Sequence, residues 1–453
     1  MKIIIVGCGQ VGETLAAELG NEGNSITMVD LSSEKISDIS SRLDIMGVVG
    51  NGATYTTLKS AGIGSADLLI AVTNSDELNL LCCIIARRHS RCQVIARIQN
   101  PEYSTEAIYL KSELGLAMVI NPDHAAAEEI ARILRFPAAN NIETFAKGRV
   151  ELLKFRIPDD SPLIGTSVKN LMTSIKCDVL ICTAERGEEA HIVNGDFVFQ
   201  ARDLISITAS PRNAAKFFKK IGMDDQSVND VFVVGINDTT KYLCGILRKS
   251  GISIKVLDSN KEKCEEFATE YDYVTVICGD EKDQNLLIEE GIERTEAFVS
   301  LTDSDEENVF LSISAKNFGS GKIITKINKP EYNSIIRHLD FDTTIFPKSI
   351  ASDKIVRYVR AMTNTLGSNV ENMYTLANGE IEVTEFLISP GSPVIGITLS
   401  KLGPMLKDDS LVAAILRGKS VIIPHGQDSI ISGDAVIIAS KHLGLNDISD
   451  LLR

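Results

Sequence analysis

A glycine-rich segment near the start of the chain has the spacing of a phosphate-binding loop. It follows an apolar run at 2–6, and its residues are Gly7, Cys8, Gly9, Gln10, Val11 and Gly12. Gly7 permits a tight turn, Gly9 lets the backbone approach a pyrophosphate, and Gly12 lets a helix lie close to a strand. The free amides at the N-terminus of that helix would face the phosphates. The segment therefore predicts a nucleotide site.

An aspartate at the end of the second apolar run supplies a candidate ribose ligand. Asp30 follows the run at 25–29, and a carboxylate there can accept hydrogen bonds from both ribose hydroxyls of an adenosine. Leu31, Ser32 and Ser33 come next, so a 2′-phosphate would meet no compensating cation and NADP is disfavoured. These residues leave NAD, NADH, ADP and ATP open. A structural turn with a solvated aspartate is the less favoured alternative.

Further polar residues follow later apolar runs. Asn51 comes after the third run, and Thr73 and Asn74 come after the fourth. Arg97 ends the fifth run, and its reach suits a phosphate or the distal part of a dinucleotide. Because parallel strands end at one edge of a sheet, these residues are expected to line one crevice. Thr73 and Asn74 could equally be helix caps, and Arg97 could be a solvated strand end.

Six short apolar runs alternate with amphipathic segments of helical spacing and would position these residues. The runs lie at 2–6, 25–29, 45–49, 67–72, 93–98 and 116–120. Such alternation implies right-handed crossovers and a parallel sheet covered on both faces. The sequence predicts a doubly wound α/β domain.

Asn121-Pro122 opens one further helix, in which proline takes a first-turn position that needs no amide donor. The alanines, Ile130, Ile133 and Leu134 of this helix form an apolar stripe. The stripe favours packing on its own domain over a dimer contact.

The chain repeats itself in the order A-B-A′-B′. Gly235 corresponds to Gly7 and Asp258 to Asp30, and the segment TDSDEEN at Thr302 matches TNSDELN at Thr73. The B segments share SPLIG and SPVIG and have the strand and turn pattern of a small mixed domain. Short polar linkers are predicted at 139–149, 222–229 and 363–372. The predicted domains are 1–138, 139–225, 229–362 and 363–453.

The second half departs from the glycine pattern. Asn237 replaces Gly9 and Thr240 replaces Gly12, so side chains stand where the backbone would meet a pyrophosphate. Asp258 remains. The second A segment is predicted to be a degenerate nucleotide domain that binds a dinucleotide weakly or not at all.

Composition excludes several classes of function. With 46 basic and 61 acidic side chains the net charge is −15, so the chain lacks the broad positive field for nucleic-acid or anionic-membrane binding. The sequence contains no apolar run of ~18 residues and no signal peptide, which favours a cytoplasmic location without membrane insertion. The nine cysteines form no C-x-x-C pair and the six histidines show no ligand spacing, so no metal site is expected.

A dehydrogenase would also need an acid or base in the crevice. The only histidines of the first A segment, His89 and His124, do not follow strand ends. No catalytic residue is assigned, and an enzyme is not expected. An NAD-dependent oxidoreductase and a free-standing nucleotide sensor remain the alternatives to a regulatory protein.

The A-B-A′-B′ plan, GCGQVG, Asp30 and the segments VVGNG, AVTNSDELN and RIQNPEY resemble the TrkA family over the whole chain. These are regulatory subunits of Trk potassium-uptake systems, built from tandem RCK (KTN) domains. The resemblance implies two Rossmann-like domains, each followed by a small α+β RCK C-terminal domain. It also implies that Gly7, Gly9, Gly12 and Asp30 hold NAD or NADH, with ATP or ADP as alternatives at the same site. Asn51, Thr73 and Arg97 would complete that pocket.

The same resemblance implies partners and a location. Such proteins form cytosolic rings, usually homotetramers for the tandem form, beneath a membrane potassium-translocating subunit (TrkH-like). Nucleotide binding in the Rossmann domains controls its gate. The protein would then lie peripherally at the inner face of the cell membrane.

Overall fold

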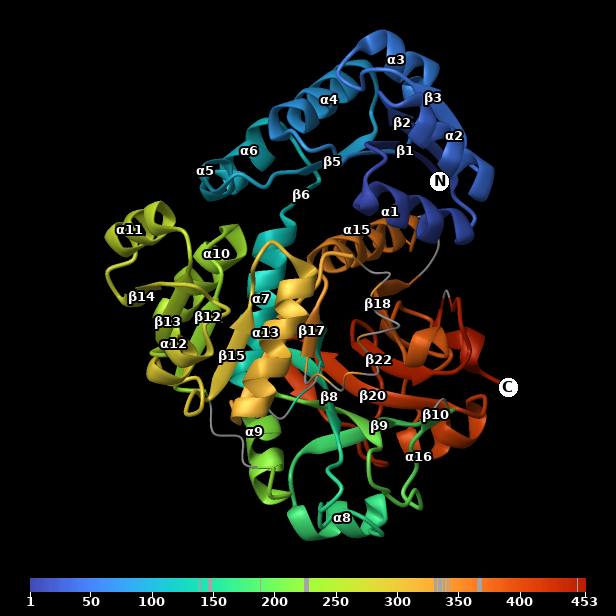
Figure 1. Ribbon diagram of the computed structural model, residues 1–453. Coiled ribbons are helices and arrows are strands. Elements are labelled where there is room, and N and C mark those ends of the chain that lie inside the picture. Colours follow the sequence, from blue (N-terminus) through green and yellow to red (C-terminus); the bar gives the residue numbers. More distant parts are fainter. Residues whose placement is uncertain are drawn as a thin grey trace. The chain divides into compact units, whose positions relative to one another are not determined.

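Each half of the chain forms a six-stranded parallel sheet followed by a five-stranded antiparallel sheet (Figure 1). The computed structural model describes residues 1–137, 139, 141–145, 149–187, 189–223, 228–329, 332, 336, 339, 341, 343–364, 369–445 and 447–453. The two parallel-sheet domains make up one unit, Met1–Ala131 with Asn229–Tyr358. The antiparallel domains make up the other, Arg132–Val228 with Val359–Arg453.

The first parallel sheet has the strand order β3-β2-β1-β4-β5-β6. Its strands are β1 (Lys2–Val6), β2 (Ser25–Asp30), β3 (Met46–Val49), β4 (Leu68–Ala71), β5 (Gln93–Arg97) and β6 (Met118–Ile120). The central strands are buried on both faces, as their continuous apolar runs predict. The order reverses between β1 and β4, where a doubly wound sheet opens a crevice. The predicted fold class is confirmed.

Helices join these strands, and several of them begin at a side-chain cap. They are α1 (Gln10–Asn21), α2 (Ser33–Arg42), α3 (Tyr55–Ser60), α4 (Asp76–His89), α5 (Pro101–Thr105), α6 (Ala107–Glu113) and α7 (Pro122–Arg135). Ser32, Thr54 and Ser75 cap α2, α3 and α4 by accepting a backbone amide three residues on. The stripe on α7 is buried within the chain, with Ile130 at 0% exposure, which favours the packing interpretation.

The second parallel sheet repeats this topology in the order β14-β13-β12-β15-β16-β17. Its strands are β12 (Asp230–Val234), β13 (Ser253–Asp258), β14 (Val274–Cys278), β15 (Ala297–Ser300), β16 (Lys322–Lys326) and β17 (Thr343–Ile345). The principal helices are α10 (Asp238–Leu247), α11 (Lys261–Glu270), α12 (Gln284–Glu289), α13 (Asp305–Phe318) and α15 (Pro347–Asn364).

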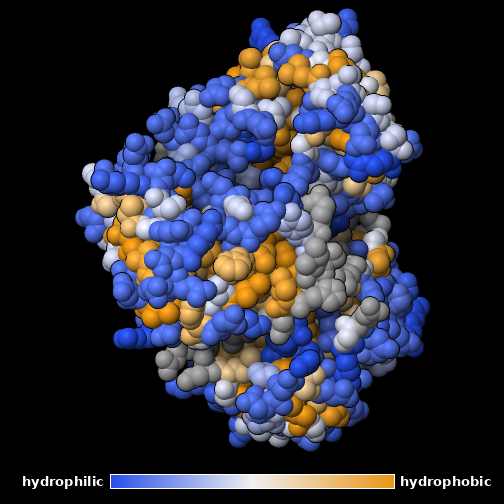
Figure 2. Space-filling model, in the orientation of Figure 1, coloured by the Kyte–Doolittle hydropathy of each residue, from blue (hydrophilic) through white to orange (hydrophobic). Residues whose placement is uncertain are grey.

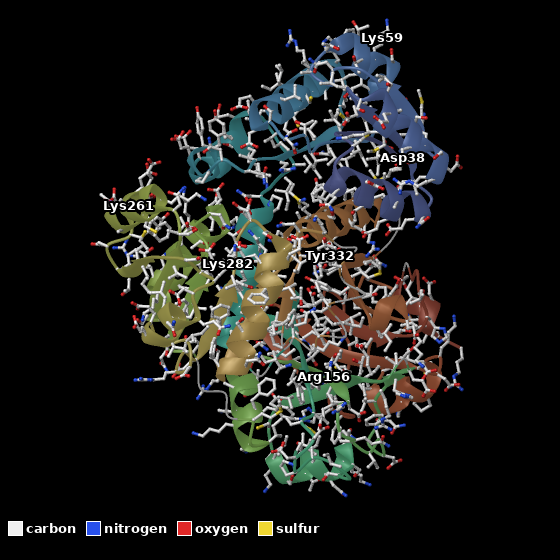
Figure 3. All side chains as sticks on the ribbon, in the orientation of Figure 1. Asp38, Lys59, Arg156, Lys261, Lys282 and Tyr332 are labelled. Atoms are coloured by element: carbon white, nitrogen blue, oxygen red, sulfur yellow. The ribbon has the colours of Figure 1, made fainter. Side chains whose placement is uncertain are left out.

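Charged side chains on both parallel-sheet domains are exposed. Asp38 and Lys59 are examples from the first domain, and Lys261 is an example from the second (Figure 3).

The first antiparallel sheet has the order β10-β9-β11-β8-β7. Its strands are β7 (Asn141–Phe145), β8 (Val150–Arg156), β9 (Val179–Arg186), β10 (Glu189–Ile192) and β11 (Leu204–Ala209), and α8 (Val168–Ile175) and α9 (Pro211–Lys220) accompany them. The second sheet has the order β18-β19-β22-β20-β21. It comprises β18 (Val370–Leu376), β19 (Ile381–Leu387), β20 (Ser410–Arg417), β21 (Ser420–Ile422) and β22 (Ala435–Ser440), with α16 (Leu399–Leu402).

The two antiparallel sheets share one apolar core. Phe145 and Leu152 of the first sheet and Tyr374 and Ile437 of the second belong to the same buried cluster. The Thr208 hydroxyl also donates a hydrogen bond of 2.7 Å to a backbone carbonyl of β20. The antiparallel domains therefore form one packed body rather than two tethered modules.

This packing corrects two of the predicted linkers. The stretch 139–149 contains β7, whose Ile142 and Phe145 are fully buried, and 363–372 contains the end of α15 and the start of β18. Residues 146–148 and 365–368 lie outside the described residues, and so do residues 224–227 of the linker predicted at 222–229. The domain boundaries stay predictions, because α7 and α15 each run from the first unit into the second.

The surface is mostly polar, in a chain of which 24% of the residues are charged. Hydrophilic residues predominate on the face shown in Figure 2, with apolar patches between them. Within the described residues, no helix combines the length and the apolar character needed to cross a bilayer.

Exchanging Asp203 for asparagine should lower the free energy of unfolding by about 2–4 kcal/mol. Asp203 is buried and receives two hydrogen bonds, of 2.8 and 2.7 Å, from the Arg186 guanidinium. A neutral amide cannot balance that cation. Asp159→Asn is the matched control, because its pair with Arg202 is exposed, and no measurable change is expected. Urea unfolding of the full chain measures both, and equal losses would contradict the assignment.

Candidate functional site

The three glycines of the first loop have different roles. Gly7 has φ +109°, and a Cβ there would lie 3.0 Å from the backbone of Val72 and Thr73. A Cβ on Gly12 would lie 2.0 Å from the Gly7 carbonyl oxygen, so the helix can approach the loop only without a side chain. Gly9, by contrast, has nothing within 4 Å of its Cβ position. Gly9 is the point at which a ligand could approach the backbone.

Asp30 braces this loop as well as facing the crevice. The Cys8 amide donates to one carboxylate oxygen at 2.7 Å, and the Ser32 amide donates to the other at 2.9 Å. Each oxygen keeps further lone pairs for a ligand. The sequence interpretation gave Asp30 a ligand role only. The structure adds that Asp30 ties the glycine loop to the turn between β2 and α2.

Two of the predicted loop residues turn their side chains into the core. Cys8 is 5% exposed and Val11 is 3% exposed, so only their backbones could meet a ligand. Burial, and then the nearby Asp30 charge, raises the pKa of the Cys8 thiol to about 12. Gln10 begins α1, and its side-chain oxygen accepts a hydrogen bond of 2.5 Å from Lys348 of α15.

Thr73 belongs to a bracing network that the sequence analysis missed. Asn79, fully buried on α4, accepts from the Thr73 amide at 2.8 Å and from its hydroxyl at 2.7 Å. The Asn79 amide nitrogen donates to the carbonyls of Thr73 at 3.1 Å and of Arg97 at 2.9 Å. It therefore joins the ends of β4 and β5. The matched positions Thr302 and Asn308 repeat the pattern, which the sequence repeat could have indicated.

The remaining predicted residues lie at the same sheet edge with different surroundings. Asn51 is exposed, and its side-chain oxygen accepts from the Ala53 amide at 2.9 Å within a turn. Asn74 is exposed before the cap of α4. Arg97 is half-buried and hydrogen-bonds Gln99; burial lowers the pKa of its guanidinium, while the charges of Asp123 and Asp76 oppose that shift. Gly7 lies against the Thr73 backbone, and Asp30 is hydrogen-bonded to Cys8, the residue that follows Gly7.

The corresponding edge of the second half caps its own helix. The Asn237 side-chain oxygen accepts from the Thr240 amide at 3.2 Å, and its nitrogen donates to the Leu301 carbonyl. The Thr240 hydroxyl donates to the Gly235 carbonyl at 2.6 Å, at the contact that Gly12 makes possible in the first half. The amides that would bind a phosphate are thus partly satisfied within the chain.

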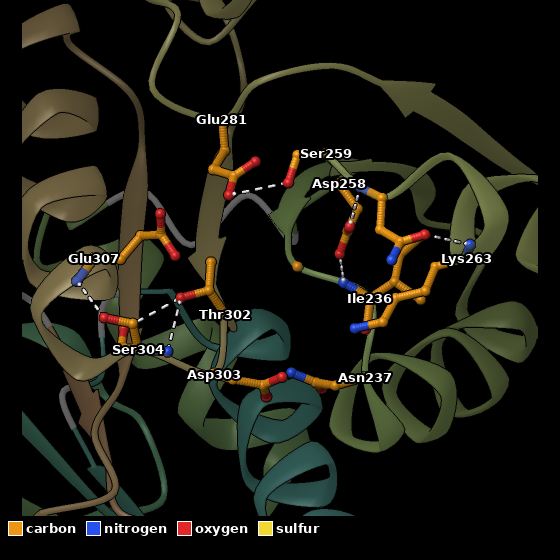
Figure 4. Close-up of a pocket in the computed structure, with 12 residues that line it drawn as sticks. Ile236, Asn237, Asp258, Ser259, Lys263, Glu281, Thr302, Asp303, Ser304 and Glu307 are labelled. Carbon is orange, nitrogen blue, oxygen red and sulfur yellow. Dashed lines mark hydrogen bonds between the residues drawn. The ribbon is translucent and has the colours of Figure 1, made fainter.

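A pocket with a cavity of about 430 Å³ opens beside this self-capped helix (Figure 4). Its walls carry four carboxylates and one ammonium group, from Asp258, Glu281, Asp303, Glu307 and Lys263. Asp258 still accepts the amides of Ile236 at 2.7 Å and Asn260 at 2.8 Å. An acidic wall disfavours a dinucleotide, as the degenerate pattern predicts. Binding at the second domain stays a prediction.

Within the part of the chain that the structure describes, no group of three or more histidine, cysteine, aspartate or glutamate side chains is placed to hold a metal ion.

Two domain families match most of the chain. The TrkA-N domain family matches residues 3–122 and 231–347, and the TrkA-C domain family matches residues 152–222 and 383–453. The chain is therefore a tandem protein of Rossmann-type domains, each followed by a small antiparallel-sheet domain. It belongs to the TrkA family, which confirms the resemblance seen in the sequence.

Similar proteins match this chain over all or nearly all of its length. The Trk system potassium uptake protein TrkA homolog of Archaeoglobus fulgidus is 30% identical, and the match covers 100% of both chains. The Trk system potassium uptake protein TrkA of Halomonas elongata is 30% identical over 97% of this chain and 95% of its own. A solved GsuK channel bound to NAD has the same fold, with a TM-score of 0.63 and 15% identity over 97% of this chain and 76% of that one.

Replacing Asn79 by alanine should destabilise the chain by about 2–3 kcal/mol, because the partly buried Thr73 amide and the Thr73 and Arg97 carbonyls lose their partners. Asn74→Ala, on the same edge but exposed, is the control and should change little. Chemical denaturation of the two variants measures the difference. An Asn79→Ala protein as stable as the parent would contradict the bracing role.

Proposed function

We propose that this chain is the nucleotide-binding regulatory subunit of a potassium-uptake system. The observation that carries the proposal is the open backbone at Gly9, at the N-terminus of α1 and beside Asp30. That arrangement offers amides to a phosphate and a carboxylate to a ribose. The names of the full-length relatives supply the transport system, since each is called a Trk system potassium uptake protein.

The proposed ligand is NAD or NADH, with ADP or ATP as competitors for the same site. Structures of this fold include a GsuK channel bound to NAD and a GsuK bound to ADP. The adenosine and phosphates common to these ligands suit Asp30 and the α1 N-terminus. Asn51, Thr73, Asn74 and Arg97 are proposed to complete the pocket from the neighbouring strand ends.

The nucleotide is proposed to act as a signal and not as a reagent. A ligand that prefers one arrangement of a protein by roughly 1 to 3 kcal/mol shifts its population about 5- to 150-fold, without any chemical step. The chain is proposed to assemble as a homotetrameric ring at the inner face of the membrane. There it would bind a TrkH-like potassium-translocating subunit and control its gate.

A Gly9→Ala variant should lose at least about tenfold in nucleotide affinity, equivalent to ~1.4 kcal/mol. The added methyl group projects into the open space at the α1 N-terminus and meets no protein atom, so folding is not expected to suffer. Isothermal titration of the full chain with NAD, NADH, ADP and ATP measures the change. Asp30→Ala would not separate ligand binding from folding, because it also removes the hydrogen bonds from Asp30 to the Cys8 and Ser32 amides.

Gly64→Ala is the matched control for that titration. Gly64 also has open space at its Cβ position, but it precedes β4 and so lies at the opposite edge of the sheet. Its affinities should equal those of the parent. Unchanged affinity in Gly9→Ala would move the site elsewhere. Steady consumption of NADH with a carbonyl substrate would instead support an oxidoreductase.

The regulatory role predicts a membrane partner. Affinity purification of the chain from gently solubilised native membranes should recover a potassium-translocating protein. In vesicles that hold this protein together with the chain, added nucleotide should change potassium flux with the parent chain but not with Gly9→Ala. A chain that binds nucleotide normally yet recovers no such protein would favour a free-standing sensor.

A further inference from the structure

Two cysteines of the second parallel-sheet domain differ from the others in their surroundings. All nine cysteines are among the described residues, and Cys278 is the one that is exposed. It ends β14. Cys264 lies on α11 and is buried. An exposed thiol beside a buried one is the arrangement in which oxidation can be passed from the first sulfur to the second.

Hydrogen bonds place the Cys264 sulfur over the end of β14. The Sγ atom donates to the Asp258 carbonyl at 3.3 Å and to the Ile277 carbonyl at 3.7 Å. Asp258 is the residue that pairs with Cys278 in the register of β13 and β14, and Ile277 directly precedes Cys278. The buried thiol is therefore held at the backbone from which the Cys278 side chain leaves.

Strand alternation directs the Cys278 side chain toward α11. Ile277 packs in the cluster that contains Leu287 of α12 and Leu311 of α13, so it faces that side of the sheet. Its neighbour Cys278 must face the other side, where Cys264 lies. After burial, the Cys278 thiol is the largest cause that raises the pKa of Cys264, to about 12. Both observations bring the two sulfurs together.

We propose that Cys264 and Cys278 form an oxidative modification site that a hydroperoxide converts into a disulfide. The exposed Cys278 thiolate attacks the peroxide oxygen, which breaks the O–O bond, releases water or an alcohol after protonation, and leaves a sulfenic acid. The Cys264 sulfur then displaces the sulfenic oxygen as water. Two thiols and one hydroperoxide thus give one disulfide, one water and one water or alcohol, and the peroxide is the species reduced.

This disulfide would join two walls of the acidic pocket. Lys263, next to Cys264, lines it from α11, and Glu281 lines it from the loop that follows Cys278 (Figure 4). Cross-linking α11 to the end of β14 fixes these walls relative to each other. The corresponding residues of the first half are Ile36 and Val49, which carry no thiol, so the modification is confined to the second domain.

Mass spectrometry of the full chain tests the proposal. The reduced protein is treated with hydrogen peroxide, free thiols are alkylated, and the chain is digested without reductant. The expected product is a peptide pair joined through Cys264 and Cys278, lighter by two hydrogens and released by dithiothreitol. The oxidised protein should also melt at a higher temperature, because the cross-link restricts the unfolded chain.

Variants distinguish the pair from general thiol oxidation. Cys278→Ser changes an exposed side chain, so the fold is retained, and it should abolish both the linked peptides and the rise in melting temperature. Cys177→Ser, at a half-buried thiol of the first antiparallel domain, should leave both intact. The proposal is overturned if peroxide takes Cys278 to a sulfinic acid without a link, or if the link joins Cys278 residues of two chains.

Discussion

A single carboxylate that accepts two backbone amides fixes the edge of each parallel sheet at which the strands end. In the first half Asp30 holds Cys8 and Ser32, and in the second half Asp258 holds Ile236 and Asn260 at nearly the same distances. The brace persists where the glycine pattern has been lost. An aspartate at the end of the second strand therefore has a structural role at this edge in both halves, and the ligand role proposed for Asp30 would be additional to it.

Most of the fold could be predicted from the sequence because its signals are local. Each apolar run became a strand within a few residues of its predicted ends, and Pro122 begins α7 as predicted. The reason given for Gly12 also rests on short-range geometry, since its contact is with the Gly7 carbonyl of the same loop. Because the second half repeats the first in sequence, the same fold could be predicted for its parallel sheet.

The missed features depend on contacts between distant parts of the chain. The sequence indicates only that Asn79 is a polar residue of a helix, yet its side chain hydrogen-bonds to the ends of two strands. The stretch NIETF reads as a polar linker, and it becomes β7 only through its antiparallel pairing with β8. The buried side chains of Cys8 and Val11 likewise follow from packing, which spacing alone does not determine.

The apolar core shared by the two antiparallel domains has a consequence for how the halves can diverge. Covalent fusion makes the meeting of these two surfaces an intramolecular event, with an effective concentration that dilution cannot lower. The two antiparallel domains therefore stay paired even when the sequence changes in the loop before α1 or in the loop before α10. The N-terminus of α10 is capped by its own side chains, whereas the N-terminus of α1 is open. A permanently joined pair of halves can tolerate this difference.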